Sequence, residues 1–229
     1  MFRLFGPSNT ILYFGCTIEF GYKNLKEVQK TLFDKLGLDF LLLREPICCG
    51  IPLKNAGFLE EYQKYKQRLV KVFEDLGTKR VICFCPSCTM GLMEALGPGV
   101  EVKFYIDFLY ENYLNRFKKF KDGTVFSFHI PCHISRGLDN FETISKFLEH
   151  LNIKVKYPEE SYKFSICCGG GGSFSSTRSE LSLDLAKDKV SSLKKISEKV
   201  LTCCPMCYHQ LTKAGANVQE LSELLINLL

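Results

Sequence analysis

Short apolar runs recur along the chain, and each ends shortly before a cysteine. In the first half they comprise residues 11–15, 39–43 and 80–82, and in the second half residues 125–128, 153–155 and 199–201. Short apolar runs bounded by turn signals are typical of strands buried on both faces, as in a parallel sheet. We therefore predict three strands in each half of the chain.

Helical patterns fill the gaps between these runs. Residues 24–36, 58–76, 141–151 and 180–196 carry apolar side chains at spacings of three and four, which predicts amphipathic helices. The alternation of strands and helices predicts an α/β fold with right-handed crossovers. Sites in such folds form in the loops at the carboxyl ends of the strands, where cysteines from separate loops can meet.

The cysteines follow an internal repeat. A shift of 119 positions superimposes Cys-Cys-Gly at 48–50 on 167–169 and Cys-Pro-x-Cys at 85–88 on 204–207. One more cysteine precedes each block, Cys16 in the first half and Cys132 in the second, related by a shift of 116. We predict two pseudo-equivalent Rossmann-like lobes with small parallel sheets, residues 1–118 and 119–229. The basic segment 116–123 at their seam is interpreted as a solvated linker.

Composition restricts what these cysteines do. Twelve cysteines in 229 residues are unusual, yet a chain of this size with 46% hydrophobic residues buries a core without disulfide staples. The start of the chain shows no secretory signal, and no run of 18 apolar residues could span a bilayer. We therefore expect a cytoplasmic protein with reduced thiols and no transmembrane segment. The net charge of +5 is spread along the chain, so no nucleic-acid partner is expected.

Five cysteines per half suit one kind of site better than the others. A zinc ion takes four ligands in a tetrahedron, and adjacent cysteines are awkward for one ion. Soft thiolates also select iron–sulfur clusters, to which five ligands are better matched. The glycine after each Cys-Cys pair permits a positive φ and lets a backbone amide approach sulfur. Structural zinc or disulfides remain the alternatives, although neither explains the doubled spacing.

Three segments carry a resemblance to a known family. They are Tyr13-Phe14-Gly15-Cys16-Thr17, His129-Ile130-Pro131-Cys132-His133-Ile134-Ser135-Arg136 and Cys167-Cys168-Gly169-Gly170-Gly171-Gly172. With the doubled five-cysteine motif, the chain resembles the CCG-domain (cysteine-rich domain) iron–sulfur family over nearly its whole length, and within it the B-type subunit of heterodisulfide reductase. The resemblance implies two noncubane [4Fe-4S] clusters. It implies that one cluster is held by a first cysteine set, formed by Cys16, Cys48, Cys49, Cys85 and Cys88. It implies that the other is held by a second cysteine set, formed by Cys132, Cys167, Cys168, Cys204 and Cys207.

The resemblance also implies an activity and partners. It implies an oxidoreductase subunit that reductively cleaves, or forms, a disulfide or related sulfur substrate. The sequence has no ferredoxin-type cysteine run and no dinucleotide fingerprint. Electrons would therefore pass through a ferredoxin-like iron–sulfur subunit and a flavoprotein. The alternatives are a non-catalytic electron-transfer subunit of a lactate- or glycolate-type dehydrogenase complex, and a zinc-stabilised regulatory module.

Several further residues have an ordinary interpretation. Cys83 and Cys203 lie outside the repeat, and we expect them to be buried as small hydrophobic side chains rather than ligands. His129 and His133 bracket Cys132, and a structural role is favoured over a role at the mouth of a cluster. For Arg136, contact with an anionic substrate and an ordinary surface pairing are equally favoured. The apolar stripe at 218–229 is interpreted as core rather than as a surface for a partner.

Overall fold

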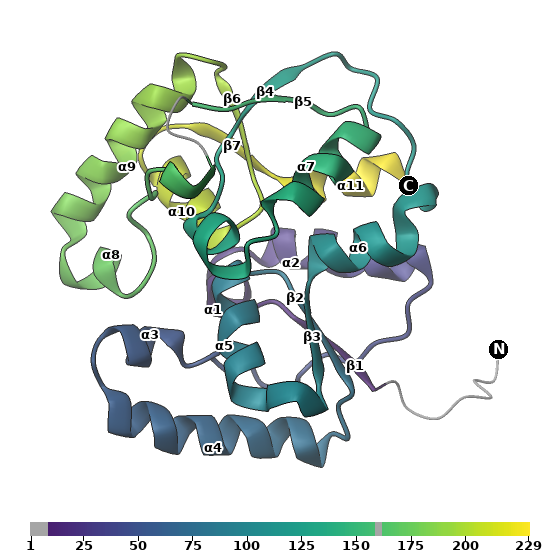
Figure 1. Cartoon of the computed structure of the whole chain (residues 1–229), viewed down its shortest axis with the longest axis vertical. Helices are drawn as coiled ribbons and strands as arrows, with labels where there is room; N and C mark the ends of the chain where they lie inside the picture. Colours follow the sequence, from purple (N-terminus) through teal and green to yellow (C-terminus); the bar gives the residue numbers. More distant parts are fainter. Residues whose placement is uncertain (1–8, 159–161) are drawn as a thin grey trace.

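The computed structural model describes residues 9–158 and 162–229, so the chain start at 1–7 that bears on a secretory signal lies outside it. Two parallel sheets organise the fold (Figure 1). The first has the order β1-β2-β3, and the second β5-β4-β6-β7. Their strands are β1 (Thr10–Tyr13), β2 (Arg80–Cys83), β3 (Glu101–Phe104), β4 (Val125–Phe128), β5 (Lys154–Lys156), β6 (Lys199–Thr202) and β7 (Asn217–Glu220). All pairings between them are parallel, which confirms the predicted α/β class with two small parallel sheets.

Helices connect the strands in both lobes. The first lobe contains α1 (Cys16–Gly21), α2 (Lys23–Leu36), α3 (Ile51–Asn55), α4 (Leu59–Asp75), α5 (Pro86–Leu96) and α6 (Tyr105–Tyr113). The second contains α7 (Phe141–His150), α8 (Phe174–Thr177), α9 (Ser179–Lys194), α10 (Pro205–Lys213) and α11 (Leu221–Leu225). Shorter turns are η1 (Gly97–Gly99), η2 (Leu114–Arg116), η4 (Tyr162–Phe164), η5 (Ile226–Leu228) and the π-helical segment η3 (His133–Leu138). The four predicted helices correspond to α2, α4, α7 and α9.

The strand predictions hold except at 39–43. There only Leu41 pairs, in an isolated bridge with Ile11. The Leu41 N–H donates to the Thr10 carbonyl over 2.8 Å, and the Leu41 carbonyl accepts from the Leu12 N–H. The charged and proline-containing residues 44–46 follow at once and end the pairing. Strands β3 and β7 were not predicted, because their lysine, glutamate, asparagine and glutamine residues hide the apolar pattern of a strand.

The hydrophobic core crosses from one lobe to the other. A single cluster of buried side chains includes Leu12 and Phe104 of the first sheet and Phe128 and Leu201 of the second. Helix α11 packs against α2 of the first lobe (Figure 1). Leucines of the C-terminal segment are buried in this cluster, which confirms that its stripe is core.

The segment 116–123 is more firmly anchored than a solvated linker. Its lysines are exposed, but Phe117 is buried in the core. The Lys118 N–H donates to the Leu228 carbonyl and the Phe120 N–H to the Leu151 carbonyl, both over 2.7 Å. Phenylalanines alternating with lysines thus fix the connection to the second lobe. Within the part of the chain that the structure describes, no helix combines the length and apolar character needed to cross a bilayer.

Candidate metal centre

In both sets, the first cysteine and the first cysteine of the CxxC pair stand where a parallel strand leads into the next helical segment. Cys16 begins α1 just after β1, and Cys85 caps the N-terminus of α5 just after β2. Cys204 likewise caps α10 after β6. In both of these CxxC loops a proline occupies the first helical position, where its missing N–H costs nothing and its fixed φ suits the helix. The repeat in sequence is therefore also a repeat of strand, cap and helix.

Thiols of the first cysteine set form a chain of contacts. Cys48 lies between Cys16 and Cys49, and Cys49 in turn contacts Cys88 of the CxxC pair. The contacts with Cys48 and Cys88 lower the pKa of the Cys49 thiol to about 5. Hydrogen bonding to Cys48 and burial raise the pKa of Cys16. The first set therefore comes together without disulfides, since all of its cysteines are free.

The second cysteine set repeats this arrangement. The Cys167 and Cys132 sulfurs lie 4.0 Å apart, and the Cys168 and Cys207 sulfurs lie 3.3 Å apart. Contacts with Cys132 and Cys168 lower the pKa of Cys167 to about 2, whereas the contact with Cys167 raises the pKa of Cys168 to about 12. Closely packed thiols thus share protons unequally. Metal ions bind the thiolate form and displace those protons.

A glycine shapes each Cys-Cys loop in the same way. The Gly50 N–H donates to the Cys48 sulfur over 3.4 Å, and the Gly169 N–H donates to the Cys167 sulfur over 3.3 Å. Both glycines have a positive φ, 81° and 77°, which other residues adopt only at a cost. Amide donors at sulfur stabilise thiolates and tune metal centres. This confirms the role expected for the glycine of each motif.

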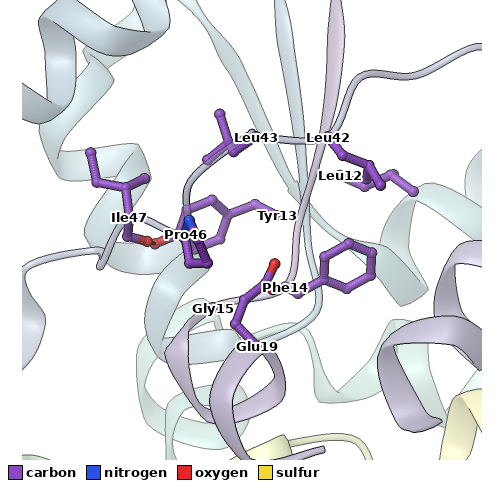
Figure 2. A pocket seen from close by; sticks show the side chains of 9 residues that line it. All are labelled: Leu12, Tyr13, Phe14, Gly15, Glu19, Leu42, Leu43, Pro46 and Ile47. Atoms are coloured by element: carbon purple, nitrogen blue, oxygen red, sulfur yellow. Dashed lines mark hydrogen bonds between the residues drawn. The ribbon is translucent and has the colours of Figure 1, made fainter. Parts of the chain in front are cut away.

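The two sets face one another across one cavity of about 180 Å³. Cys85 of the first set contacts Cys204 of the second, and contacts with Cys204 and Cys88 keep the pKa of Cys85 well below its ordinary value. Cysteines from both lobes line the cavity: Cys16, Cys49, Cys85, Cys88, Cys132, Cys167, Cys168 and Cys204. By contrast, the hollow beside β1 in Figure 2 has a volume of only about 10 Å³, about the minimum that a water needs.

A glycine- and serine-rich loop closes one side of this shared cavity. Gly170, Gly171 and Gly172 line it, together with Ser173 and two serines within α8. The Ser173 hydroxyl donates to the Pro52 carbonyl of the first lobe over 3.1 Å. The glycine run was expected only as part of the cysteine motif, and its bridging position was missed. The length of the glycine run in the sequence could have indicated this position, because a turn alone requires fewer glycines.

The residues beside the motifs differ in what they do. Cys83 and Cys203 are fully buried among core side chains, as predicted. Arg136 donates to the Ser165 carbonyl over 2.9 Å, a structural contact within the lobe. His133 lines the shared cavity, and its Nδ1 lies 3.5 Å from the Cys132 sulfur. His133 therefore lies beside the site, and its favoured structural role stays a prediction.

Comparison with known proteins agrees with this geometry. A family model described as "Cysteine-rich domain" (CCG) matches residues 10–93 and 126–212, one match for each lobe. The chain belongs to this family. Both matched segments contain one complete five-cysteine set.

Curated relatives connect the chain to redox enzymes. It is 26% identical to the D-type subunit of the dihydromethanophenazine:CoB–CoM heterodisulfide reductase of Methanosarcina acetivorans, over 91% of this chain and 54% of the relative. It is 26% identical to an uncharacterized iron–sulfur protein of Methanococcus maripaludis, over 85% of this chain and 39% of that protein. The lactate utilization protein A of Bacillus subtilis is 25% identical, over 83% of this chain and 84% of its own length. The chain is thus an iron–sulfur CCG-domain protein related to oxidoreductase subunits, and it spans about half the length of the reductase subunits.

Among solved structures, the aspartate racemase of Picrophilus torridus covers 96% of this chain and 91% of its own. The TM-score is 0.43 and the identity is 12%. This similarity is too low to bear on function.

Proposed function

We propose that each lobe, residues 1–118 and 119–229, holds one noncubane [4Fe-4S] cluster on its five-cysteine set. The donor set fits such a group, because five free thiols converge in each lobe without forming a disulfide. Amide N–H groups at Cys48 and Cys167 supply the hydrogen bonds that thiolate-bound clusters require. A single zinc ion would leave a fifth thiol unused in each set.

We propose that the chain is a catalytic subunit of the B type found in heterodisulfide reductases, and that a disulfide or related sulfur compound binds in the shared cavity. The reaction would consume one disulfide, two electrons and two protons and release two thiols, or run in reverse. The observation that carries this proposal is the opening of both cysteine sets into one cavity of about 180 Å³.

The chain's own residues would bind and orient this substrate. The cavity is lined mainly by sulfur, glycine and apolar atoms, with Phe14 and Met206 among them, and such a lining suits an uncharged S–S group. His133 lies where a ring nitrogen can hold a proton for a departing thiolate. When bound, the clusters would supply electrons one at a time to the substrate sulfurs.

Partner subunits would deliver the electrons. The sequence offers no dinucleotide-binding fingerprint and no ferredoxin-type motif. The reductase relatives are themselves subunits of larger enzymes, and we propose a ferredoxin-like iron–sulfur subunit and a flavoprotein as partners of this chain.

A second candidate is a non-catalytic electron-transfer subunit of a lactate- or glycolate-type dehydrogenase complex. The observation favouring it is similarity. The chain is 25% identical to the lactate utilization protein A of Bacillus subtilis, about the same as its 26% identity to the reductase subunit of Methanosarcina acetivorans. The shared cavity favours the first candidate, because a disulfide bound there could give one sulfur to each cysteine set.

The test is an anaerobic preparation assayed for iron, acid-labile sulfide and zinc, followed by EPR with and without small disulfides and thiols. The proposal expects about eight irons per chain, two clusters of four, and spectra that change when the sulfur compound is added. Eight irons with spectra indifferent to every disulfide and thiol would favour the electron-transfer candidate. Zinc in an iron-replete, air-free preparation would overturn both.

A further inference from the structure

His129 is a fully buried polar side chain with no visible purpose in the fold. It follows β4 directly, and its exposed fraction is 0%. Its backbone is used, since the N–H donates to the Leu201 carbonyl and the carbonyl accepts from the Thr202 hydroxyl. Among the described residues, however, neither ring nitrogen has a hydrogen-bond partner. Buried polar groups are nearly always paired, and an unpaired one indicates a partner such as a bound ion.

The side chain lies beside the second cysteine set. A ring nitrogen of His129 and the sulfurs of Cys168 and Cys207 all lie within 4.8 Å of one another. An imidazole has at least one N–H in either protonation state. A cluster on these cysteines would place sulfur atoms within reach of that N–H and would satisfy it.

The first lobe has a different residue at this place. The shift of 116 that relates Cys16 to Cys132 also relates Tyr13 to His129. The Tyr13 hydroxyl is already used, because it donates to the Ile47 carbonyl over 2.6 Å (Figure 2). Its neighbours Cys49 and Cys88 are the counterparts of Cys168 and Cys207. The two otherwise repeated sites therefore differ in one buried donor.

We propose that His129 donates a ring N–H to sulfur of the cluster in the second lobe, and that the first cluster has no corresponding bond. The inference rests on the proposed function, since it requires both clusters. Hydrogen bonds to sulfur offset the negative charge added on reduction and raise the reduction potential. The second cluster is thereby the easier of the two to reduce, so the lobes differ in function although their cysteines repeat.

The experiment compares His129→Phe, His129→Gln and the matched first-lobe variant Tyr13→Phe with the parent chain, each prepared anaerobically. Iron content is measured first. Redox titrations followed by EPR then give the potential of each cluster, and pulsed EPR on protein labelled with ¹⁵N-histidine detects nitrogen near the spin. Because His133 also lies near a cysteine sulfur, His133→Phe is labelled as well.

The proposal expects His129→Phe, at full iron content, to lower one potential by about 59 mV, a tenfold change in a one-electron equilibrium constant. His129→Gln, which keeps an N–H, should recover part of the lost potential. Tyr13→Phe should leave the potential of the second-lobe cluster unchanged. A weak histidine coupling persists in His133→Phe. Unchanged potentials in a fully loaded His129→Phe protein, or no coupling in His133→Phe, would overturn the proposal. A strong coupling from nitrogen bonded to iron would replace it with direct ligation. Low iron in the parent chain would instead refute the proposed clusters themselves.

Discussion

Replacing Gly169 by alanine should damage the second lobe selectively. Gly169 has a φ of 77°, and an alanine Cβ there would lie 2.7 Å from the Ser182 carbonyl oxygen. That oxygen cannot move freely, because it accepts a hydrogen bond from the buried Gln210 amide over 3.1 Å. The left-handed conformation costs a non-glycine residue about 1–2 kcal/mol. Displacing Ser182 would cost about 1 kcal/mol more for its hydrogen bond.

These costs sum to about 2–3 kcal/mol, which lowers Tm by about 4–12 °C in a protein of this size. Because the Gly169 N–H lies at the Cys167 sulfur, the same change should reduce iron content toward half. The matched control is Gly171→Ala, whose Cβ would meet nothing within 4 Å. Thermal unfolding and iron assays on both variants measure the effects. Equal Tm and iron in Gly169→Ala and the parent, or equal losses in Gly171→Ala, would refute the reasoning.

Three further predictions concern buried groups. The Cys203→Ala variant should keep all of its iron, because Cys203 packs in the core. The adjacent Cys204→Ala variant should lose about half of its iron. An iron assay that found equal contents in the two would contradict the assignment of ligands. Burial raises the pKa of Glu220 from 4.5 to about 7, so the folded state retains a proton that the unfolded state has lost. The stability of the parent relative to Glu220→Gln should therefore fall by about 1.5 kcal/mol between pH 5.5 and 7, and a constant difference in the free energy of unfolding would refute this. Tyr105→Phe removes the 2.9 Å hydrogen bond to Glu220 that joins the lobes. Above pH 7 this should lower the free energy of unfolding by about 1.5–3 kcal/mol. Denaturant unfolding measures this loss, which should be smaller at pH 5.5.

The sequence was sufficient for the parts of the fold that obey a simple period. Strand β1 is apolar after its first residue, β6 has an apolar pair at its centre, and helices α4 and α9 have apolar residues every three or four positions. The doubled motif also located the first cysteine and the CxxC pair of each half just after a strand, and parallel strands present all of their carboxyl ends at one edge of the sheet. Strand β7 escaped prediction since its pairing is set by neighbouring strands rather than by its own polar residues.

The relation between the two cysteine sets could not be predicted from the repeat. A repeat states that two sites are alike but not that they face each other, which depends on packing between the lobes. The contact of Cys85 with Cys204 and the bridge from Ser173 to Pro52 are long-range consequences of that packing. The purpose of His129 was likewise hidden, because only its burial without a partner distinguishes it from a structural histidine.

The central claim is that one chain holds two iron–sulfur clusters on either side of one cavity. Anomalous diffraction at the iron absorption edge, from crystals grown without air, tests it most directly. We expect two four-iron sites in each chain, one on each cysteine set, both at the cavity that the two sets line. A single site, or scattering at the zinc edge in place of iron, would contradict the claim.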